Sequence, residues 1–279
     1  MTDFLGQHPQ VGMCRWKETH HFAGPLYWSR FGPFRDDHPS TREDYLTFFA
    51  AAQDRQRIGE ASVWYLHSPT AAHDIGEFDP AADIIVMLRN PLEMLPSLHA
   101  QLVYLGIEHE TDLERALARD PIRAEQGGPA GFPPDSYADA AQFASQLRRY
   151  FDVFPRDQIH VVIYDDFKAD PTSSYLALCA ELGIATDVPV DVSVVNPRRR
   201  VRSHSLNRAL GRSPDRLRGS RLGVRVHEWN TPVAATKSAL SPAVVRALTP
   251  VVAQQVEELG ALLGADLSHW LREDATMKL

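Results

Sequence analysis

Residues 82–99 read ADIIVMLRNPLEMLPSLH, and this stretch decides the fold class. Its first seven residues, 82–88, are mostly apolar and rich in β-branched side chains, which is typical of a buried strand. Asn90 is of a type preferred at the start of a helix, and Pro91 is favoured as the first helical residue. Leucines at positions 95, 98, 102 and 105 then recur at helical spacing. The stretch therefore predicts a strand that leads directly into a helix.

The same alternation of strand and helix continues along the chain. Residues 11–16 and 160–164 have the composition of buried strands. Helices are predicted over residues 42–56, 137–151 and 171–182 (with Gly183 as its stop), and two more after Ser241-Pro242 and Thr249-Pro250. We therefore expect an α/β fold in a single domain, residues 1–279, with a central parallel sheet between two layers of helices. Ligands of such sheets bind at the carboxyl ends of the strands.

Composition excludes several classes of protein. The 279 residues carry a net charge of −7, which argues against a nucleic-acid partner for the whole molecule. Two cysteines, Cys14 and Cys179, are too few for a disulfide scaffold and suggest a reducing compartment. The longest apolar runs are far shorter than the roughly 20 residues of a membrane span. The first ten residues do not resemble a secretory signal, so we expect a cytoplasmic protein.

Two segments differ in character from the rest of the chain. Residues 108–136 are polar and then rich in glycine and proline, which predicts a lid or an excursion that faces a ligand. Residues 197–225 contain ten arginines against one acid, Asp215. Such a cluster could bind anions, with Arg198 and Arg202 as the candidates, or it could be a solvated basic surface. Both interpretations stay open.

The junction after residues 82–88 is a candidate anion site. The start of a helix offers unpaired N–H groups and the positive end of the helix dipole, and Arg89 adds a planar charged fork beside Asn90. Ser97 lies eight residues further on and off the leucine seam, so its hydroxyl could meet a ligand along the helix. Alternatively, Ser97 is an ordinary surface residue and Arg89 pairs with an acid such as Glu93. The spacing alone does not separate the two.

These residues resemble a known motif. Arg89-Asn90-Pro91 followed by Ser97 is similar to the 3′-phosphate-binding motif of sulfotransferases that use PAPS (3′-phosphoadenosine 5′-phosphosulfate). Four further blocks resemble that family and occur in its order, so that the likeness covers nearly the whole chain. They are HPQVGMCRWKETHHF (8–22), GEASVWYLHSP (59–69), FPRDQIHVVIYDDFKADP (154–171) and LLGADLSHWL (262–271).

The resemblance is to the bacterial, heparan-type related sulfotransferases, and it implies a three-layer fold like that of P-loop NTPases. It also implies a donor site. Arg89 and Ser97 would hold the 3′-phosphate of PAPS beside Asn90. Arg198 and Arg202 would belong to a late basic loop that closes over the nucleotide. The product would be PAP, the desulfated nucleotide, and no metal would be needed because a sulfuryl group carries less charge than a phosphoryl group.

On the acceptor side, the resemblance implies that Glu18 is the general base. Sulfuryl transfer to an alcohol needs a base because the hydroxyl is a poor nucleophile until its proton is removed. Lys17 would offset charge on the transferring group, and His20 could replace the base or contact the acceptor. Alternatively, Lys17 and Glu18 form an exposed pair of little consequence. The acceptor hydroxyl could belong to a small molecule, a lipid or a carbohydrate, and no oligomeric state is predicted.

One part of the family pattern is absent. The family begins with a strand and a phosphate loop of the form G…K-[SA]-G-T-T, which holds the 5′-phosphosulfate, and neither occurs in this sequence. Either the true start lies upstream of Met1, which we favour, or the 5′-site has been lost. The second case predicts a non-catalytic, sulfotransferase-like module that binds a nucleotide or an anionic polymer. A nucleotide kinase on the same fold is less favoured because the sequence has no Walker lysine.

Overall fold

A computed structural model places the chain in two compact units, one formed by residues 1–89 with 145–195 and the other by residues 90–144 with 196–279. Each unit is described by itself. The predicted single domain covers both units and stays a prediction. The residues that the structure describes are 1–23, 39, 41–105, 107–121, 137–192, 202–211, 213, 217, 220–231 and 240–272.

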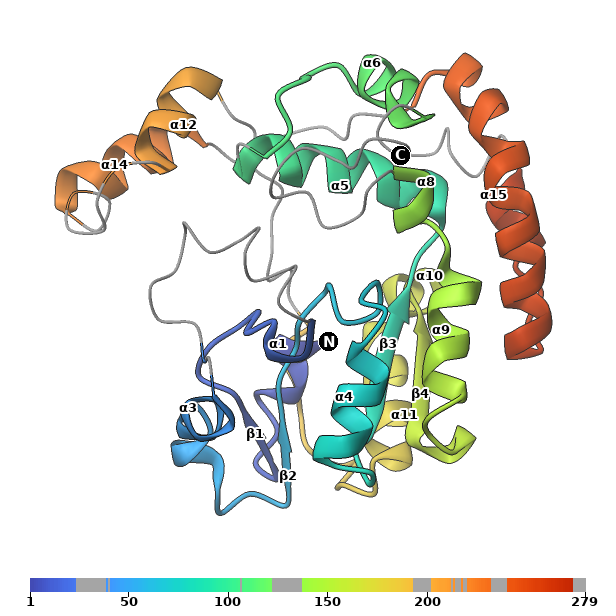
Figure 1. Cartoon of the computed structure of the whole chain (residues 1–279). Coiled ribbons are helices and arrows are strands. Elements are labelled where there is room, and N and C mark those ends of the chain that lie inside the picture. The colour runs from blue at the N-terminus through green and yellow to red at the C-terminus, as the bar shows by residue number, and fades with distance from the viewer. Residues whose placement is uncertain are drawn as a thin grey trace. The chain divides into compact units, whose positions relative to one another are not determined.

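The first unit contains four strands, β1 (Val11–Met13), β2 (Arg57–Gly59), β3 (Ile84–Leu88) and β4 (Ile159–Ile163). β1 and β2 lie side by side, as do β3 and β4, and both pairs are parallel (Figure 1). The α/β class and the parallel pairing are therefore confirmed. Within the described residues, however, the strands form two separate pairs and not one continuous sheet.

Apolar packing and one arginine connect the two pairs of strands. A cluster of buried side chains joins β1 to α1 (Thr2–Leu5) and α11 (Pro171–Glu181), and Ile85 of β3 packs against it. Arg57 of β2 lies with its Nη1 atom 3.0 Å from Oδ2 of Asp83, just before β3. The same guanidinium donates to the carbonyl of Leu182 at 2.8 and 3.0 Å. The cluster comprises Phe4, Leu5, Val11, Tyr175, Leu178, Cys179, Leu182 and Ile184.

A second, mainly aromatic cluster lies beside β1 and β2. It joins the short 3-10 helix η1 (His21–Ala23) to α3 (Arg42–Thr47) and α4 (Ala71–Phe78), and its member Phe49 directly precedes the 3-10 helix η3 (Ala50–Ala52). The other short elements described in this unit are η4 (Arg156–Gln158) and α10 (Tyr164–Ala169). The helix α9 (Phe143–Phe151) begins two residues before residue 145, where the second segment of this unit starts. The buried members of the cluster are Phe22, Tyr45, Phe48, Phe49 and Ala71.

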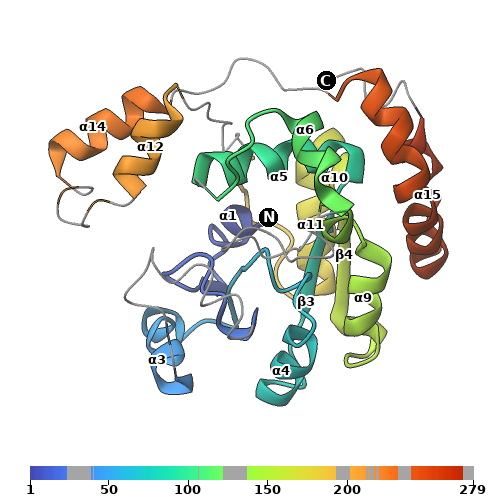
Figure 2. The ribbon, with the colours of Figure 1, turned by 45° about the horizontal axis from the view of Figure 1, so that its top comes forward.

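The described part of the second unit contains helices and no strand. α12 and α14 lie side by side in both views (Figures 1 and 2). No helix in the described ranges combines the length and the apolar character that crossing a membrane requires. The helices are α5 (Pro91–Leu105), α6 (Leu113–Ala118), α8 (Tyr137–Ala140), α12 (His204–Gly211), α14 (Arg221–Asn230), α15 (Pro242–Leu263) and η5 (Ser268–Leu271).

Three helix predictions are corrected by the structure. The helix expected over residues 42–56 ends at Thr47, and the 3-10 helix η3 follows it. The two helices expected after residue 241 are one continuous helix, α15, because Pro250 removes a single backbone donor and the buried apolar seam continues beyond it. α15 ends at Gly264, which has a φ of +67°. The helix expected over residues 137–151 is interrupted between α8 and α9. α6 lies within the predicted lid; the lid's residues 122–136 lie outside the described part, and its role stays a prediction.

Candidate functional site

The turn of residues 18–20, which follows β1, has an unusual backbone. Glu18 has a φ of +62° and His20 a φ of +51°, and both values fall in the left-handed region. That region costs a residue with a side chain roughly 1–2 kcal/mol. Strained residues of this kind persist only where the surroundings fix them, and they cluster at functional sites. The backbone therefore marks this turn independently of any motif.

Hydrogen bonds from the segment after β2 hold the Glu18 carboxylate. The Val63 N–H donates to Oε2 of Glu18 at 2.8 Å, and the Glu18 N–H donates to the Ala61 carbonyl at 3.1 Å. Nε2 of His20 lies 3.8 Å from the same Oε2. The Glu18 side chain is 28% exposed and that of His20 is 9% exposed. The structure thus brings these two predicted residues together, with a carboxylate that is fixed in place but still accessible.

A second carboxylate, Glu60, lies behind this turn. Its Oε2 atom accepts hydrogen bonds from the hydroxyls of Thr19 at 2.9 Å and Ser62 at 3.0 Å. Its Oε1 atom accepts from the hydroxyl of Tyr45 at 3.2 Å and from that of Tyr65. Burial raises the pKa of Glu60, and the four hydrogen bonds oppose that rise. We call these five side chains the Glu60 network.

Both tyrosines of the Glu60 network remain protonated donors. Burial, with a contribution from the nearby Glu60 charge, raises the pKa of Tyr45 and of Tyr65 far above the ordinary tyrosine value. The sequence analysis did not single out Glu60 as a functional residue. In the sequence, only the position of Glu60 inside the GEASVWYLHSP block could have drawn attention to it. That block does not show that four hydroxyl groups bind its carboxylate.

Lys17 lies beside the turn but is oriented toward a different acid. Its Nζ atom is 3.9 Å from Oδ2 of Asp3, and both side chains are about half exposed. An exposed pair of this kind contributes roughly 0–1 kcal/mol to stability. The contact does not test a role for Lys17 in sulfuryl transfer, and that role stays a prediction.

Arg89 lies where the sequence predicted it, directly after the last residue of β3. Its guanidinium stacks over the ring of Tyr164, at 5.1 Å from the ring centroid. Tyr164 itself directly follows β4. Arg89 and Tyr164 therefore both follow the carboxyl end of a strand of the parallel β3–β4 pair, which is where α/β sheets bind ligands.

The start of α5 does not offer the unpaired N–H groups that the sequence analysis expected, so that expectation is wrong. Pro91 has no N–H, and the Leu92 N–H donates to Oδ1 of Asn90 at 2.9 Å. The next two N–H groups, of Glu93 and Met94, donate to the Asn90 carbonyl at 3.0 and 2.9 Å. Asn90 therefore caps the start of α5 with both its side chain and its carbonyl.

The side chains of Asn90 and Ser97 are also engaged within the second unit. Nδ2 of Asn90 donates to the Trp270 carbonyl at 3.2 Å, and Asn90 is 3% exposed. The Ser97 hydroxyl donates to the Glu93 carbonyl one turn earlier, at 3.2 Å. Arg89 and Ser97 belong to different units, so each is described in its own surroundings. The donor-binding roles of Ser97 and Asn90 stay predictions.

Of the two arginines predicted in the basic segment, Arg198 lies outside the described residues. Arg202 is described, and it is exposed. Its backbone N–H donates to the Asn230 carbonyl at 2.8 Å, and its guanidinium lies 5.2 Å from the ring centroid of Trp229. Its predicted contact with the donor is not tested by this arrangement.

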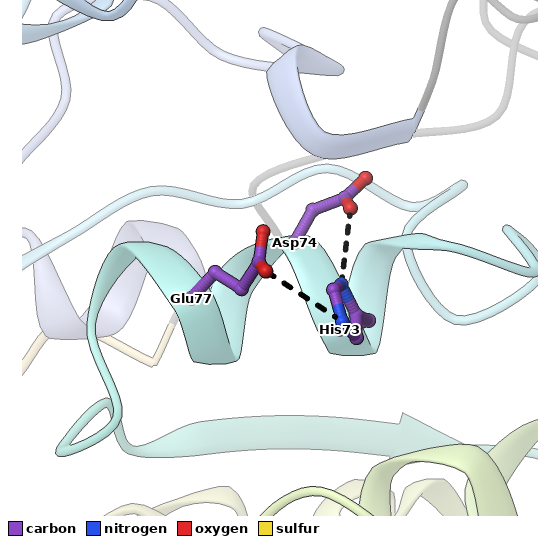
Figure 3. A group of neighbouring side chains, drawn as sticks. All are labelled: His73, Asp74 and Glu77. Carbon is purple, nitrogen blue, oxygen red and sulfur yellow. Dashed lines mark ion pairs between the residues drawn. The ribbon is translucent and has the colours of Figure 1, made fainter.

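One group of side chains among the described residues has the composition of a metal site. His73, Asp74 and Glu77 lie on α4 with their ligand atoms within 4.8 Å of one another (Figure 3). Nδ1 of His73 is 3.6 Å from Asp74, and Nε2 is 3.7 Å from Glu77. The two ring nitrogens face different carboxylates and the His73 side chain is 68% exposed, which is the pattern of surface ion pairs. The group carries no argument for a metal.

The comparisons with known proteins bear on the whole chain. No model of a protein family matches it, and no curated protein matches it. The crystal structure of a sulfotransferase from Alicyclobacillus acidocaldarius is similar over 97% of this chain and 92% of that one, with a TM-score of 0.70 and 26% identity. A sulfotransferase domain from the curacin biosynthetic pathway matches 81% of this chain and 68% of that one, at 13% identity. Its TM-score of 0.36 is too low to carry an argument.

Proposed function

We propose that this chain, which is similar to a solved sulfotransferase over 97% of its length, transfers a sulfuryl group from PAPS to an acceptor hydroxyl, with Glu18 as the general base. The observation that carries the proposal is the Glu18 carboxylate itself. It is partly exposed, it projects from a left-handed turn, and the Val63 N–H fixes one of its oxygens at 2.8 Å. Ordinary surface glutamates do not need such a backbone.

The proposed reaction is an in-line displacement at sulfur. The acceptor oxygen forms a bond to the sulfur atom while the bond from sulfur to the phosphate oxygen of PAPS breaks, which releases PAP. The hydroxyl proton passes to Glu18. Proton transfer to a positioned side chain typically contributes 10²–10⁴-fold to the rate. His20, whose Nε2 lies 3.8 Å from the Glu18 carboxylate, would replace Glu18 as the base or contact the acceptor.

For the donor, we assign the 3′-phosphate to Arg89 with Ser97. A guanidinium directly after the carboxyl end of β3 fits a phosphate group. Asn90 would act by fixing the start of α5. Arg198 and Arg202 would approach the donor from the basic segment. Lys17 would offset charge on the transferring group.

The acceptor class stays broad within this proposal: a small molecule, a lipid or a carbohydrate that presents a hydroxyl. We also propose that the reaction takes place in the cytoplasm, without a metal. Support for the compartment comes from Cys14 and Cys179, which are both free thiols.

Calorimetric titration with PAP, beside 5′-AMP as the control, tests the donor assignment. We expect PAP to bind with a clear preference over 5′-AMP, since only PAP carries a 3′-phosphate. Release of PAP from PAPS, measured with a panel of a primary alcohol, a phenol and a monosaccharide, tests the reaction. Binding of PAP without any turnover would favour the non-catalytic alternative. Equal affinity for PAP and 5′-AMP would contradict the donor site.

A further inference from the structure

We propose that Glu60 is a positioning residue that holds the turn of residues 18–20 in its left-handed backbone and thereby fixes the Glu18 carboxylate. The catalytic consequence rests on the proposed function, in which Glu18 is the base. The structural claim does not, since it concerns only how the turn is held.

The turn of residues 18–20 must be held by contacts from outside its own segment. Glu18, with a φ of +62°, is not one of the residue types that adopt this region readily. His20 adds a second positive φ, of +51°, two residues later. At Glu18 the local sequence preference therefore opposes the conformation, and tertiary bonds must stabilise it.

Hydrogen bonds from the turn converge on Oε2 of Glu60. Thr19, which lies between the two strained residues and is fully buried, donates its hydroxyl proton to Oε2 at 2.9 Å. The His20 N–H donates to the Ser62 hydroxyl at 3.0 Å, and that hydroxyl donates to the same Oε2 at 3.0 Å. Thr19 is thus connected to Glu60 directly through its side chain, and the His20 backbone is connected to Glu60 by two successive hydrogen bonds through Ser62.

Position 60 requires a carboxylate, and the tyrosines of the aromatic cluster hold its other oxygen. The hydroxyls of Tyr45 and Tyr65 occupy Oε1, and both rings belong to the aromatic cluster, where Tyr45 is 4% exposed. Four hydroxyl donors match an ionised carboxylate, which accepts up to about four hydrogen bonds and donates none. A glutamine would place an NH₂ group against two of these donors.

The test uses Val63 as a reporter, because its N–H donates directly to Glu18. In a ¹H–¹⁵N spectrum of the wild-type chain, we expect the Val63 amide shift to follow the ionisation of Glu18 as pH is varied. Glu18→Gln should remove that change, which verifies the reporter. Glu60→Gln and Thr19→Val should each reduce it by more than half. They should also lower kcat about 100-fold, as expected for a displaced catalytic group, with the KM for PAPS unchanged.

Two variants make the same chemical changes elsewhere in the first unit. Glu43→Gln alters an exposed glutamate of α3, and Thr47→Val removes an exposed hydroxyl that donates to the Asp44 carbonyl at 2.7 Å. Both should titrate at Val63 and turn over PAPS as the wild type does. If Glu60→Gln fails to fold by circular dichroism, Thr19→Val, which retains the Glu60 carboxylate, decides the question.

The proposal is overturned if the Val63 amide of the folded variants titrates as in the wild type, whatever their activity. It is also overturned if Thr47→Val changes that titration as much as Thr19→Val does. A lost reporter signal in a chain that never transfers a sulfuryl group would support the positioning role and contradict the proposed function alone. The two claims therefore fail separately.

Discussion

The turn at Glu18 and the start of α5 were both found through sequence motifs, but the structure builds them in opposite ways. At α5, Asn90 caps the helix with its own side chain and carbonyl, so the local sequence explains the conformation. At Glu18, the backbone is left-handed in two residues, and partners more than 40 positions away hold it. One region is relaxed and the other is strained.

Folding stability explains the capped start of α5, but it does not explain the strained turn at Glu18. A capped helix start would be retained for stability alone, whether or not Arg89 binds a phosphate. A strained turn with a half-buried carboxylate behind it reduces stability, so its presence points to a function that needs that geometry. The backbone geometry therefore supports a role for Glu18 in addition to the resemblance, whereas only the resemblance supports roles for Ser97 and Asn90.

The largest expected effect is on the binding of PAP when Arg89 is replaced. Arg89→Ala should weaken the binding of PAP about 10- to 100-fold, since a hydrogen-bonded charged group contributes roughly 1.5–3 kcal/mol. Calorimetry measures the change. Arg156→Ala is the matched control, because its guanidinium also lies over a ring, that of Phe151 at 4.8 Å. Equal losses in the two variants would remove Arg89 from the donor site.

A smaller effect is expected at Asn90. Asn90→Ala should lower the free energy of unfolding by about 2 kcal/mol, because it removes both a cap and the hydrogen bond to the Trp270 carbonyl. Thr41→Ala, which removes only the cap of α3, should cost about 1 kcal/mol. Urea unfolding gives both values. A smaller loss at Asn90 than at Thr41 would mean that the start of α5 is not held as described.

Glycine and alanine should reverse their usual order at the strained turn. Glu18→Gly should be about 1 kcal/mol more stable to urea than Glu18→Ala, because only alanine pays the steric cost of a φ of +62°. At Glu257, an exposed position inside α15, glycine should instead be about 1 kcal/mol less stable than alanine. The same order at both positions would show that the turn is not strained.

The smallest effect is a pH dependence of stability from Glu60. Because burial raises its pKa above the value of about 4.3 in the unfolded chain, the native state binds more protons than the unfolded state between those two values. Stability should therefore fall as pH rises through that window. Glu60→Gln should lack this component in urea titrations at several pH values, and Glu43→Gln should retain it. An identical pH dependence of stability in the wild type, Glu60→Gln and Glu43→Gln would contradict the raised pKa of Glu60.

The sequence predicted the elements whose signals are local. β3 and β4 have apolar, β-branched patterns, α5 starts at Asn90-Pro91, and α11 is followed by Gly183, so these elements appear near their expected positions. Pro250 misled the prediction because a proline looks like a helix start, while the buried seam that carries α15 past it is a tertiary effect.

The candidate site was predictable only in part. Glu18 and Arg89 stand inside motifs, and the structure places them after β1 and β3. The Glu60 network was not predictable, since Thr19, Tyr45 and Glu60 meet only through folding. The positive φ of Glu18 was hidden as well, because no glycine or asparagine marks it.

The most direct measurement compares the turnover of PAPS by the wild type, Glu18→Gln and Glu43→Gln, with the affinity for PAP measured on the same samples. A general base at Glu18 predicts that kcat falls about 10²–10⁴-fold in Glu18→Gln alone, while all three chains bind PAP equally. Turnover by Glu18→Gln at the wild-type rate would contradict the assignment of Glu18 as the base.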